Sequence, residues 1–293
     1  MTVWLIGNRG MLGADLQSLL DSSGVAYIAS DAEVDITDPE ALKAFGRLHR
    51  NKEIDWIVNC SGYTAVDRAE DEPDLAFRIN AEGVLNIART AAAIDAKVVH
   101  ISTDYVFDGK SSSPYTEQDM PAPLGVYGRS KLEGDRLLQG ATPRHYILRT
   151  AWLYSTRGVN FVRTMLRLFR EREAVRVVSD QRGSPTYAKD LAAAIFHIIR
   201  NDNAQYGIYN YTNEGETSWY DFARAIFDQA IRFGLVEKPV RIDSLSTSEY
   251  PTKAERPRYS YLSKEKIKQV FGIAIRTWQE ALRECIAVLR EET

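Results

Sequence analysis

Tyr127 and Lys131 stand four residues apart in the segment VYGRSK, which runs on into the helix-forming stretch LEGDRLLQ. On a helix, residues at positions i and i+4 lie on one face, so the ammonium group can approach the phenol. A phenol has an ordinary pKa of about 10, and a neighbouring positive charge lowers that value. The pair therefore fits a proton-transfer device. Taken alone, the segment also fits a surface helix whose aromatic ring covers a lysine stem.

A glycine-rich segment near the N-terminus gives this pair a context. Gly7, Gly10 and Gly13 form G-x-x-G-x-x-G directly after the β-rich run TVWLI and open into the helical run ADLQSLLDSSG. Early glycines permit a tight turn and a close approach to a pyrophosphate, and the last one lets the helix pack against the strand. The helix N-terminus then offers N–H groups and a positive dipole to the phosphates. We predict a dinucleotide site here, with a plain strand-to-helix turn as the alternative.

Two charged residues near this loop bear on the cofactor. Asp31, at the end of the run AYIAS, is placed to accept hydrogen bonds from an adenosine ribose, which favours NAD. Arg9, inside the loop, could instead pair with a 2′-phosphate and favour NADP. Both NADPH and NADH stay open at this point.

The elements that must position these groups alternate along the chain, as in a parallel sheet covered by helices on both faces. The runs with strand character lie at residues 2–6, 26–30, 54–60, 97–103, 145–150 and 174–180, and those with helical character at 14–24, 38–50, 73–95, 155–173, 218–231 and 263–272. We predict an α/β fold: a Rossmann-type, doubly wound parallel sheet in residues 1–150, followed by a smaller, mostly helical C-terminal substrate domain in residues 151–293. The strand AVRVVSD is expected to join the first sheet, so that residues 174–200 or so return to the Rossmann core.

The composition excludes several classes of function. The chain has 293 residues, 44% of them hydrophobic and 26% charged, with a formal net charge of -3. It lacks the basic excess expected of a nucleic-acid-binding surface and any apolar run near the roughly 20 residues that cross a bilayer. Cys60 and Cys285 lie far apart, which argues against a disulfide framework and indicates the cytoplasm. The four histidines are scattered, and we expect no transition-metal site.

Over nearly its whole length the sequence resembles the extended short-chain dehydrogenase/reductase family, and within it the dTDP-4-dehydrorhamnose reductases. Y-x-x-x-K alone is shared by many reductases, epimerases and dehydratases, but its combination with the other segments is much narrower. The segments that carry the resemblance are GNRGMLG, IVNCSGYTAVDRAEDEP, VHISTDYVFDG, PLGVYGRSKLEGD, ILRTAWLYS, NFVRTMLRL, DQRGSPTYAKDLA and RPRYSYL.

The resemblance implies that hydride passes from NADPH or NADH to the C4 ketone of dTDP-4-dehydro-L-rhamnose, giving dTDP-L-rhamnose, a nucleotide sugar for polysaccharide synthesis. It implies that Tyr127 donates the proton, that Lys131 holds the ribose and tunes the tyrosine, and that Thr103 hydrogen-bonds both the substrate and Tyr127. The family positions that contact the sugar nucleotide are matched by Thr103, Asp104, Trp152 and Arg256. Those that contact the cofactor are matched by Gly7, Arg9, Gly10, Met11, Leu12, Gly13, Asp31, Asp35, Ile36, Gly62, Tyr63, Thr64, Tyr127 and Lys131.

Departures from the family pattern concern a metal and the cofactor crevice. Some relatives dimerise through magnesium held by surface carboxylates. Asp15 falls where one such acid occurs, but Lys189 stands where another is expected, and the tail at 290–293 gives no third match. The sequence therefore predicts no firm Mg²⁺ site and leaves monomer and homodimer open. Cys60 and Ser61 replace small alanines, a change too small to block cofactor entry.

Three functions remain to be compared. A reductase consumes external NAD(P)H, whereas a sugar-nucleotide epimerase or dehydratase uses the same Tyr127 and Lys131 but returns the hydride to the sugar. The third possibility is a non-catalytic, reductase-like regulatory subunit. Such a chain has little reason to keep Thr103, Tyr127 and Lys131 together, and the RTAWLY segment and the short length favour the reductase.

Overall fold

A parallel sheet of six strands forms the larger half of the molecule. The computed structural model describes residues 1–49 and 53–291. The strands lie in the order β10-β5-β4-β3-β1-β2, and each neighbouring pair is parallel. Their bounds are Thr2–Ile6 (β1), Ala26–Ser30 (β2), Trp56–Asn59 (β3), Lys97–Thr103 (β4), His145–Thr150 (β5) and Gly207–Asn210 (β10). The predicted doubly wound parallel sheet is confirmed.

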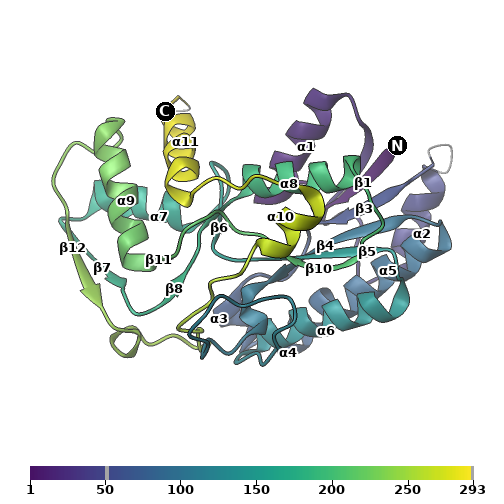
Figure 1. Cartoon of the computed structure of the whole chain (residues 1–293), viewed down its shortest axis with the longest axis horizontal. Helices are drawn as coiled ribbons and strands as arrows, with labels where there is room; N and C mark the ends of the chain where they lie inside the picture. Colours follow the sequence, from purple (N-terminus) through teal and green to yellow (C-terminus); the bar gives the residue numbers. More distant parts are fainter. Residues whose placement is uncertain (50–52, 292–293) are drawn as a thin grey trace.

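Helices cover both faces of this sheet, with α1, α8 and α10 on one side and α4, α5 and α6 on the other (Figure 1). Alternate residues of β1 point to opposite faces, so Val3 packs in the core beneath α1 and α8, whereas Trp4 packs in the core beneath α2 and α5. The helices of this half are α1 (Met11–Ser23), α2 (Pro39–Leu48), α3 (Val66–Ala69), α4 (Pro73–Phe77), α5 (Gly83–Ala93), α6 (Val126–Ala141), α8 (Ala188–Arg200) and α10 (Glu265–Phe271). The predicted helix at 38–50 matches α2, and its last residue lies outside the described residues.

The helix predicted over residues 73–95 contains a local change of winding. A π-helical turn, Arg78–Glu82, joins α4 to α5, and a 3-10 turn, Asp104–Val106, follows β4. Asn80, in the π turn, is buried and turns its side chain toward the loop after β3. Such single π turns often occur at functional sites.

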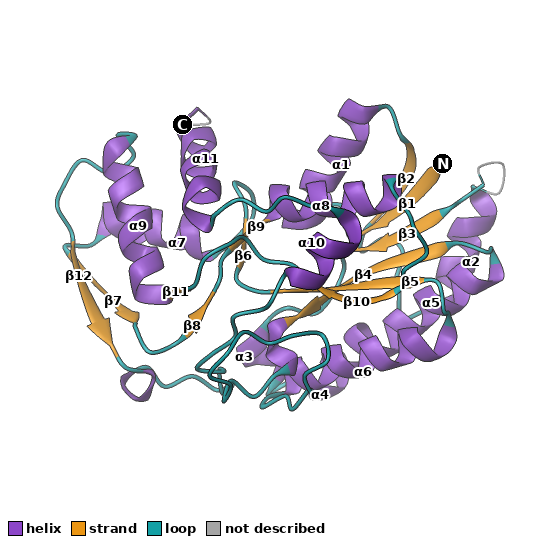
Figure 2. Ribbon diagram, viewed as in Figure 1, coloured by secondary structure: helices purple, strands orange, loops and turns teal. Residues whose placement is uncertain are grey.

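The smaller half packs α7 and α9 against a two-stranded parallel sheet made of β7 and β12, and a third helix, α11, packs on α9 (Figure 2). Aromatic and aliphatic side chains, among them Phe169, Phe222 and Trp278, form its separate core. The elements here are β6 (Leu153–Tyr154), α7 (Phe161–Glu171), β7 (Ala174–Val178), β8 (Arg182–Gly183), β9 (Thr186–Tyr187), β11 (Thr217–Ser218), α9 (Trp219–Arg232), β12 (Arg241–Leu245), a 3-10 turn (Thr247–Glu249) and α11 (Trp278–Glu291).

One strand lies in a different sheet from the one expected. The run AVRVVSD does form a strand, β7, but it pairs with β12 and not with the first sheet. The β-branched run predicted the strand, whereas its partner lies more than sixty residues away in the sequence and left no local signal. The sixth strand of the first sheet is β10, and the chain returns to that sheet with α8, β10 and α10. The boundary near residue 150 stays a prediction.

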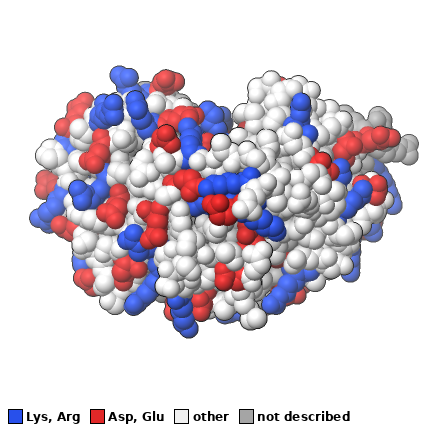
Figure 3. Space-filling model, in the orientation of Figure 1, with Lys and Arg blue, Asp and Glu red and all other residues white. Residues whose placement is uncertain are grey.

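The surface shows no dominant charge on the face drawn in Figure 3, where basic and acidic side chains are interspersed. In the part of the chain that the structure describes, no helix combines the length and the apolar character needed to span a membrane.

Candidate active site

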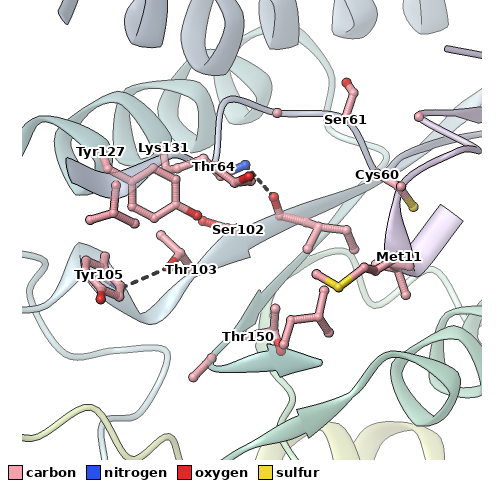
Figure 4. Close-up of a pocket in the computed structure, with 18 of the residues that line it drawn as sticks. Met11, Cys60, Ser61, Thr64, Ser102, Thr103, Tyr105, Tyr127, Lys131 and Thr150 are labelled. Carbon is pink, nitrogen blue, oxygen red and sulfur yellow. Dashed lines mark hydrogen bonds between the residues drawn. The ribbon is translucent and has the colours of Figure 1, made fainter. Parts of the chain in front are cut away.

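The carboxyl ends of β1, β3, β4 and β5 surround a cavity of about 670 Å³ (Figure 4). β2 and β3 lie on opposite sides of β1, so the chain reverses its direction across the sheet there. Open parallel sheets bind ligands at such a switch point. The predicted site residues that line the cavity are Gly7, Arg9, Gly10, Met11, Leu12, Asp31, Gly62, Thr64, Thr103, Asp104, Tyr127, Lys131 and Trp152.

The glycine loop after β1 has the shape that a pyrophosphate requires. Gly7 has φ +80° and donates its N–H to the carbonyl of Ser30 at 2.7 Å. A Cβ at Gly13 would lie 2.1 Å from the Gly7 oxygen, whereas one at Gly10 would have 3.4 Å to its nearest neighbour. Gly10 is also the N-cap of α1, and no side chain caps the N–H groups of the first turn. The loop therefore fits the pyrophosphate of a dinucleotide.

Two alanine substitutions should separate the two roles of these glycines. Gly13→Ala crowds the backbone and is expected to lower the free energy of unfolding by about 1–3 kcal/mol. Gly10→Ala fits the free protein but places a methyl group where the phosphates approach, so it should leave stability unchanged and weaken NADPH binding by about tenfold, or 1.4 kcal/mol. Urea denaturation and NADPH fluorescence titration measure the two effects. Equal losses of stability in both variants would contradict this assignment.

The adenosine end of the cavity carries charges of both signs. The Asp31 carboxylate accepts the Arg9 backbone N–H at 3.0 Å, and the Arg9 guanidinium lies 3.3 Å from Glu33. Asp31 is thus held at the mouth of the loop, where the ribose of a dinucleotide binds. Arg9 stands beside it, so an acid for ribose hydroxyls and a cation for a 2′-phosphate are both present.

A second loop, after β3, is fixed from behind by the π turn. Asn80 accepts the N–H of Tyr63 at 2.8 Å and donates to its carbonyl at 3.0 Å, and it also donates to Ser130 on α6 at 3.0 Å. Gly62 and Thr64 face the cavity. The π turn therefore holds the loop after β3 in register with α6.

Three side chains from α6 and β4 line one side of the cavity. Tyr127 and Lys131 lie on one face of α6, and Thr103 is the last residue of β4. Figure 4 shows all three on the same side of the cavity, opposite Met11 and Cys60. Lys131 is 4% exposed and donates to the carbonyl of Ile101 at 2.6 Å.

The predicted effect of Lys131 on the phenol is wrong for this structure. Burial raises the pKa of Tyr127 to about 12, and a hydrogen bond with Thr103 offsets only part of the rise. Burial also lowers the pKa of Lys131 to about 8, which weakens any pull of its charge on the phenol. Desolvation dominates because both groups lie inside the protein. Tyr127 is therefore a neutral phenol across the physiological pH range, which suits a proton donor.

Comparisons with known proteins decide the family. The family model described as RmlD substrate binding domain matches residues 1–291. The chain belongs to this family. It is similar to the dTDP-4-dehydrorhamnose reductase of Aggregatibacter actinomycetemcomitans, with 42% identity over 285 residues that cover 95% of this chain and 96% of that protein.

Solved structures of the RmlD family give the same result. A dTDP-4-dehydrorhamnose reductase from Clostridium acetobutylicum superposes with a TM-score of 0.91 at 39% identity, covering 99% of this chain and 100% of that one. One from Bacillus anthracis, in complex with NADP, has a TM-score of 0.91 at 36% identity and covers 100% of this chain and 99% of that one. The resemblance of the sequence to the dTDP-4-dehydrorhamnose reductases is confirmed.

Two predicted substrate residues in this RmlD-family cavity have unusual surroundings. Burial raises the pKa of Asp104 to about 6, a rise that the hydroxyls of Ser260 and Thr103 oppose, and its Oδ2 is fully buried. Trp152 has a left-handed backbone, φ +49°, and its ring stacks on Trp219 with centroids 3.6 Å apart. Trp152 also lines the cavity.

Five predicted residues lie outside the cavity lining. Arg256 binds Asp67 through two hydrogen bonds of 3.1 and 2.8 Å, so its guanidinium is already paired. Asp35 accepts two bonds from Thr37, and Ile36 packs in the core beneath α5. Gly13 lies under the loop, and the hydroxyl of Tyr63 donates to Glu72 at 2.6 Å.

Sequence reasoning missed several residues of the site. Ser102 and Tyr105 flank Thr103 in the segment HISTDYVF and line the cavity beside it, so the strand end itself could have indicated them. Asn80 left no such signal, because its partners are 17 and 50 residues away in sequence.

The RmlD-family chain shows no metal centre in the part that the structure describes, where no group of three or more His, Cys, Asp or Glu side chains could hold an ion. Asp15 accepts a hydrogen bond from Ser155 at 3.1 Å, and Lys189 pairs with Glu284 at 2.7 Å. The last two residues of the tail lie outside the described residues.

Proposed function

We propose that this protein is an NAD(P)H-dependent reductase that converts the C4 ketone of dTDP-4-dehydro-L-rhamnose to the alcohol of dTDP-L-rhamnose. The observation that carries this proposal is the meeting of Thr103, Tyr127 and Lys131 in one cavity with the glycine loop. Relatives named dTDP-4-dehydrorhamnose reductase support the substrate, and the relative in complex with NADP supports the cofactor.

Each side chain has a defined role in this reaction. Bound NADPH or NADH supplies the hydride. Tyr127 keeps its proton at neutral pH and gives it to the C4 oxygen, because a developing alkoxide is a stronger base than a phenolate. Thr103 acts on the phenol, whose pKa it lowers, and its Oγ1 donates to Asp104 at 3.0 Å, so Thr103 links the phenol to the sugar site. Lys131, on the same face of α6 as Tyr127, would hold the ribose of the bound cofactor.

The two halves of the chain divide the remaining work. Residues 1–150 bind the dinucleotide and also supply Thr103 and Asp104 to the sugar site, and residues 151–293 supply the rest of the sugar-nucleotide site, apart from the segments that return to the first sheet. Asp104 accepts sugar hydroxyls, and Trp152 covers one face of the ring. The paired Arg256 contributes to the substrate site only if its contact with Asp67 is exchanged for one with the diphosphate. The enzyme works in the cytoplasm as a monomer or homodimer, in keeping with its two distant cysteines.

One assay separates the reductase from the two alternatives. The purified protein is supplied with dTDP-4-dehydro-L-rhamnose and, in separate reactions, NADH and NADPH. A reductase oxidises one cofactor per sugar reduced, and the product is dTDP-L-rhamnose. An epimerase or dehydratase would change the sugar without net loss of absorbance at the reduced cofactor's maximum. A regulatory subunit would bind the cofactor and reduce nothing.

A further inference from the structure

A buried acid follows the active-site lysine along α6. Asp135 stands four residues after Lys131, as Lys131 stands four after Tyr127, so the three share one face of the helix. Asp135 is 1% exposed and does not line the cavity. Removing a charged carboxylate from water costs on the order of several kcal/mol of folding free energy unless partners compensate for the lost hydration. The partners of Asp135 should therefore indicate its role.

One carboxylate oxygen of Asp135 accepts a hydrogen bond and the other does not. Ser102 donates its hydroxyl to Oδ2 at 2.8 Å, and the Nε of Arg149, itself buried, lies 3.7 Å from the same oxygen. Oδ1 is buried and has no hydrogen-bond partner within the described structure. It lies 3.8 Å from Nε2 of His100. The open side of the carboxylate therefore faces the imidazole.

Hydrogen bonds on the far side of His100 fix its tautomer. The N–H and the hydroxyl of Ser61 both donate to Oδ1 of Asn59, at 3.0 and 2.6 Å. The amide nitrogen of Asn59 must then face Nδ1 of His100, which lies 3.1 Å away and accepts its hydrogen. The imidazole proton is therefore on Nε2. Burial and the charge of Lys131 hold the pKa of His100 well below its usual value, so the ring is neutral.

Nε2 of His100 lies between the acid and the lysine. Its distance to Nζ of Lys131 is 3.4 Å, and its distance to Oδ1 of Asp135 is 3.8 Å. Burial lowers the pKa of Lys131 to about 8, and the negative charge of Asp135 opposes this fall. Without that charge, the amino group would lose its proton at a lower pH.

We propose that Asp135 is a positioning residue whose negative charge, shared between Arg149 and Lys131, keeps the Lys131 amino group charged, with His100 as the neutral residue between Asp135 and Lys131. The inference rests on the proposed function, in which a charged Lys131 holds the ribose. The negative charge of Asp135 raises the pKa of Lys131, while burial raises the pKa of the Asp135 carboxyl and the charges of Arg149 and, less strongly, Lys131 oppose that rise. The other titratable and charged groups around these three residues are Tyr127 on α6, Asp104 after β4, His145 and Arg149 on β5, and Glu117, whose charge acts on Arg149.

The direct test is a titration of Lys131 in the protein without cofactor. The ¹³Cε resonance of Lys131, assigned by its loss in Lys131→Met, should titrate near pH 8 in the wild type. In Asp135→Asn, which keeps the shape and the bond from Ser102, the midpoint should fall by about 1–3 pH units. The alkaline limb of kcat/KM for NADPH should move down with it. A purely structural residue would lower activity equally at every pH.

A double variant controls for the possibility that Asp135→Asn alone destabilises the fold. Asp135→Asn leaves the Arg149 guanidinium buried without its acid, whereas Asp135→Asn with Arg149→Met removes the pair together, a change that buried ion pairs often tolerate. The lowered midpoint in the double variant would support the proposal, and a wild-type midpoint there would overturn it. Glu133→Gln, an exposed acid on the same helix, should leave the midpoint unchanged. If even the wild type reduced no ketosugar, the proposed function would fail while the ¹³C titration still tested Asp135.

Discussion

Replacement of Tyr127 by phenylalanine is expected to lower kcat by about 10²–10⁴, the usual contribution of a positioned general acid. The change removes the hydroxyl but keeps the ring, which packs edge-on against Tyr105 with centroids 5.6 Å apart. Cofactor binding should therefore stay nearly intact. Steady-state kinetics with the ketosugar measure kcat, and NADPH fluorescence titration measures the affinity for the cofactor.

A matched control is available in the same half of the protein. Tyr115 is a buried tyrosine outside the cavity lining, and its hydroxyl donates to Asp108 at 3.0 Å. Tyr115→Phe also removes one tyrosine hydroxyl but should keep kcat within a factor of about three, because its bond to the ionised Asp108, which contributes about 1.5–3 kcal/mol, acts on stability and lies outside the cavity. If Tyr127→Phe retained more than a tenth of the wild-type kcat, Tyr127 would not be the proton donor.

Replacement of Lys131 by methionine should weaken the binding of NADPH, which precedes hydride transfer. Methionine fills the buried space, but it removes the donor that faces the cavity and the bond to the Ile101 carbonyl. A hydrogen bond from a charged group contributes about 1.5–3 kcal/mol, so kcat/KM for NADPH should fall by about 10- to 150-fold, and the loss of orientation at the ribose should add to it. The kinetic signature is a raised KM for NADPH together with a lowered kcat.

The separate effects on kcat and on KM for NADPH distinguish the role of Tyr127 from that of Lys131. Tyr127→Phe should change kcat alone, whereas Lys131→Met should change both constants. Lys110→Met, at an exposed lysine in the loop after β4, is the control and should change neither. A Lys131→Met enzyme with wild-type KM for NADPH would contradict the assignment of Lys131 to the ribose.

Local patterns in the sequence predicted most of the larger half. The run TVWLI, the three glycines and the helix that ends at Gly24 appear in the structure as β1, the loop and α1, because a strand-to-helix turn is encoded by adjacent residues. The spacing of Tyr127 and Lys131 was enough to place them on one helix face. Features that depend on a few consecutive residues can be predicted without a structure.

Features that depend on distant residues were not predicted. The run AVRVVSD gave a strand, but nothing in it specified β12 as the partner. The π turn at Arg78–Glu82 lies within an apparently regular helical pattern, and its purpose is visible only where Asn80 meets the loop after β3. The predicted lowering of the Tyr127 pKa was wrong for the same reason. Burial by the whole fold raises this pKa and outweighs the charge of Lys131 one turn away.

The return of α8, β10 and α10 to the first sheet makes the N-terminal half dependent on the rest of the chain. Leu16 on α1, Leu191 on α8 and Ile267 on α10 belong to one core, and β10 completes the sheet beside β5. A polypeptide cut after residue 150 would leave β5 as an unprotected edge and uncover the apolar side of α1, the conditions under which chains aggregate. Heat or denaturant should accordingly melt both halves in a single transition, and no free-standing dinucleotide module can be excised from this protein.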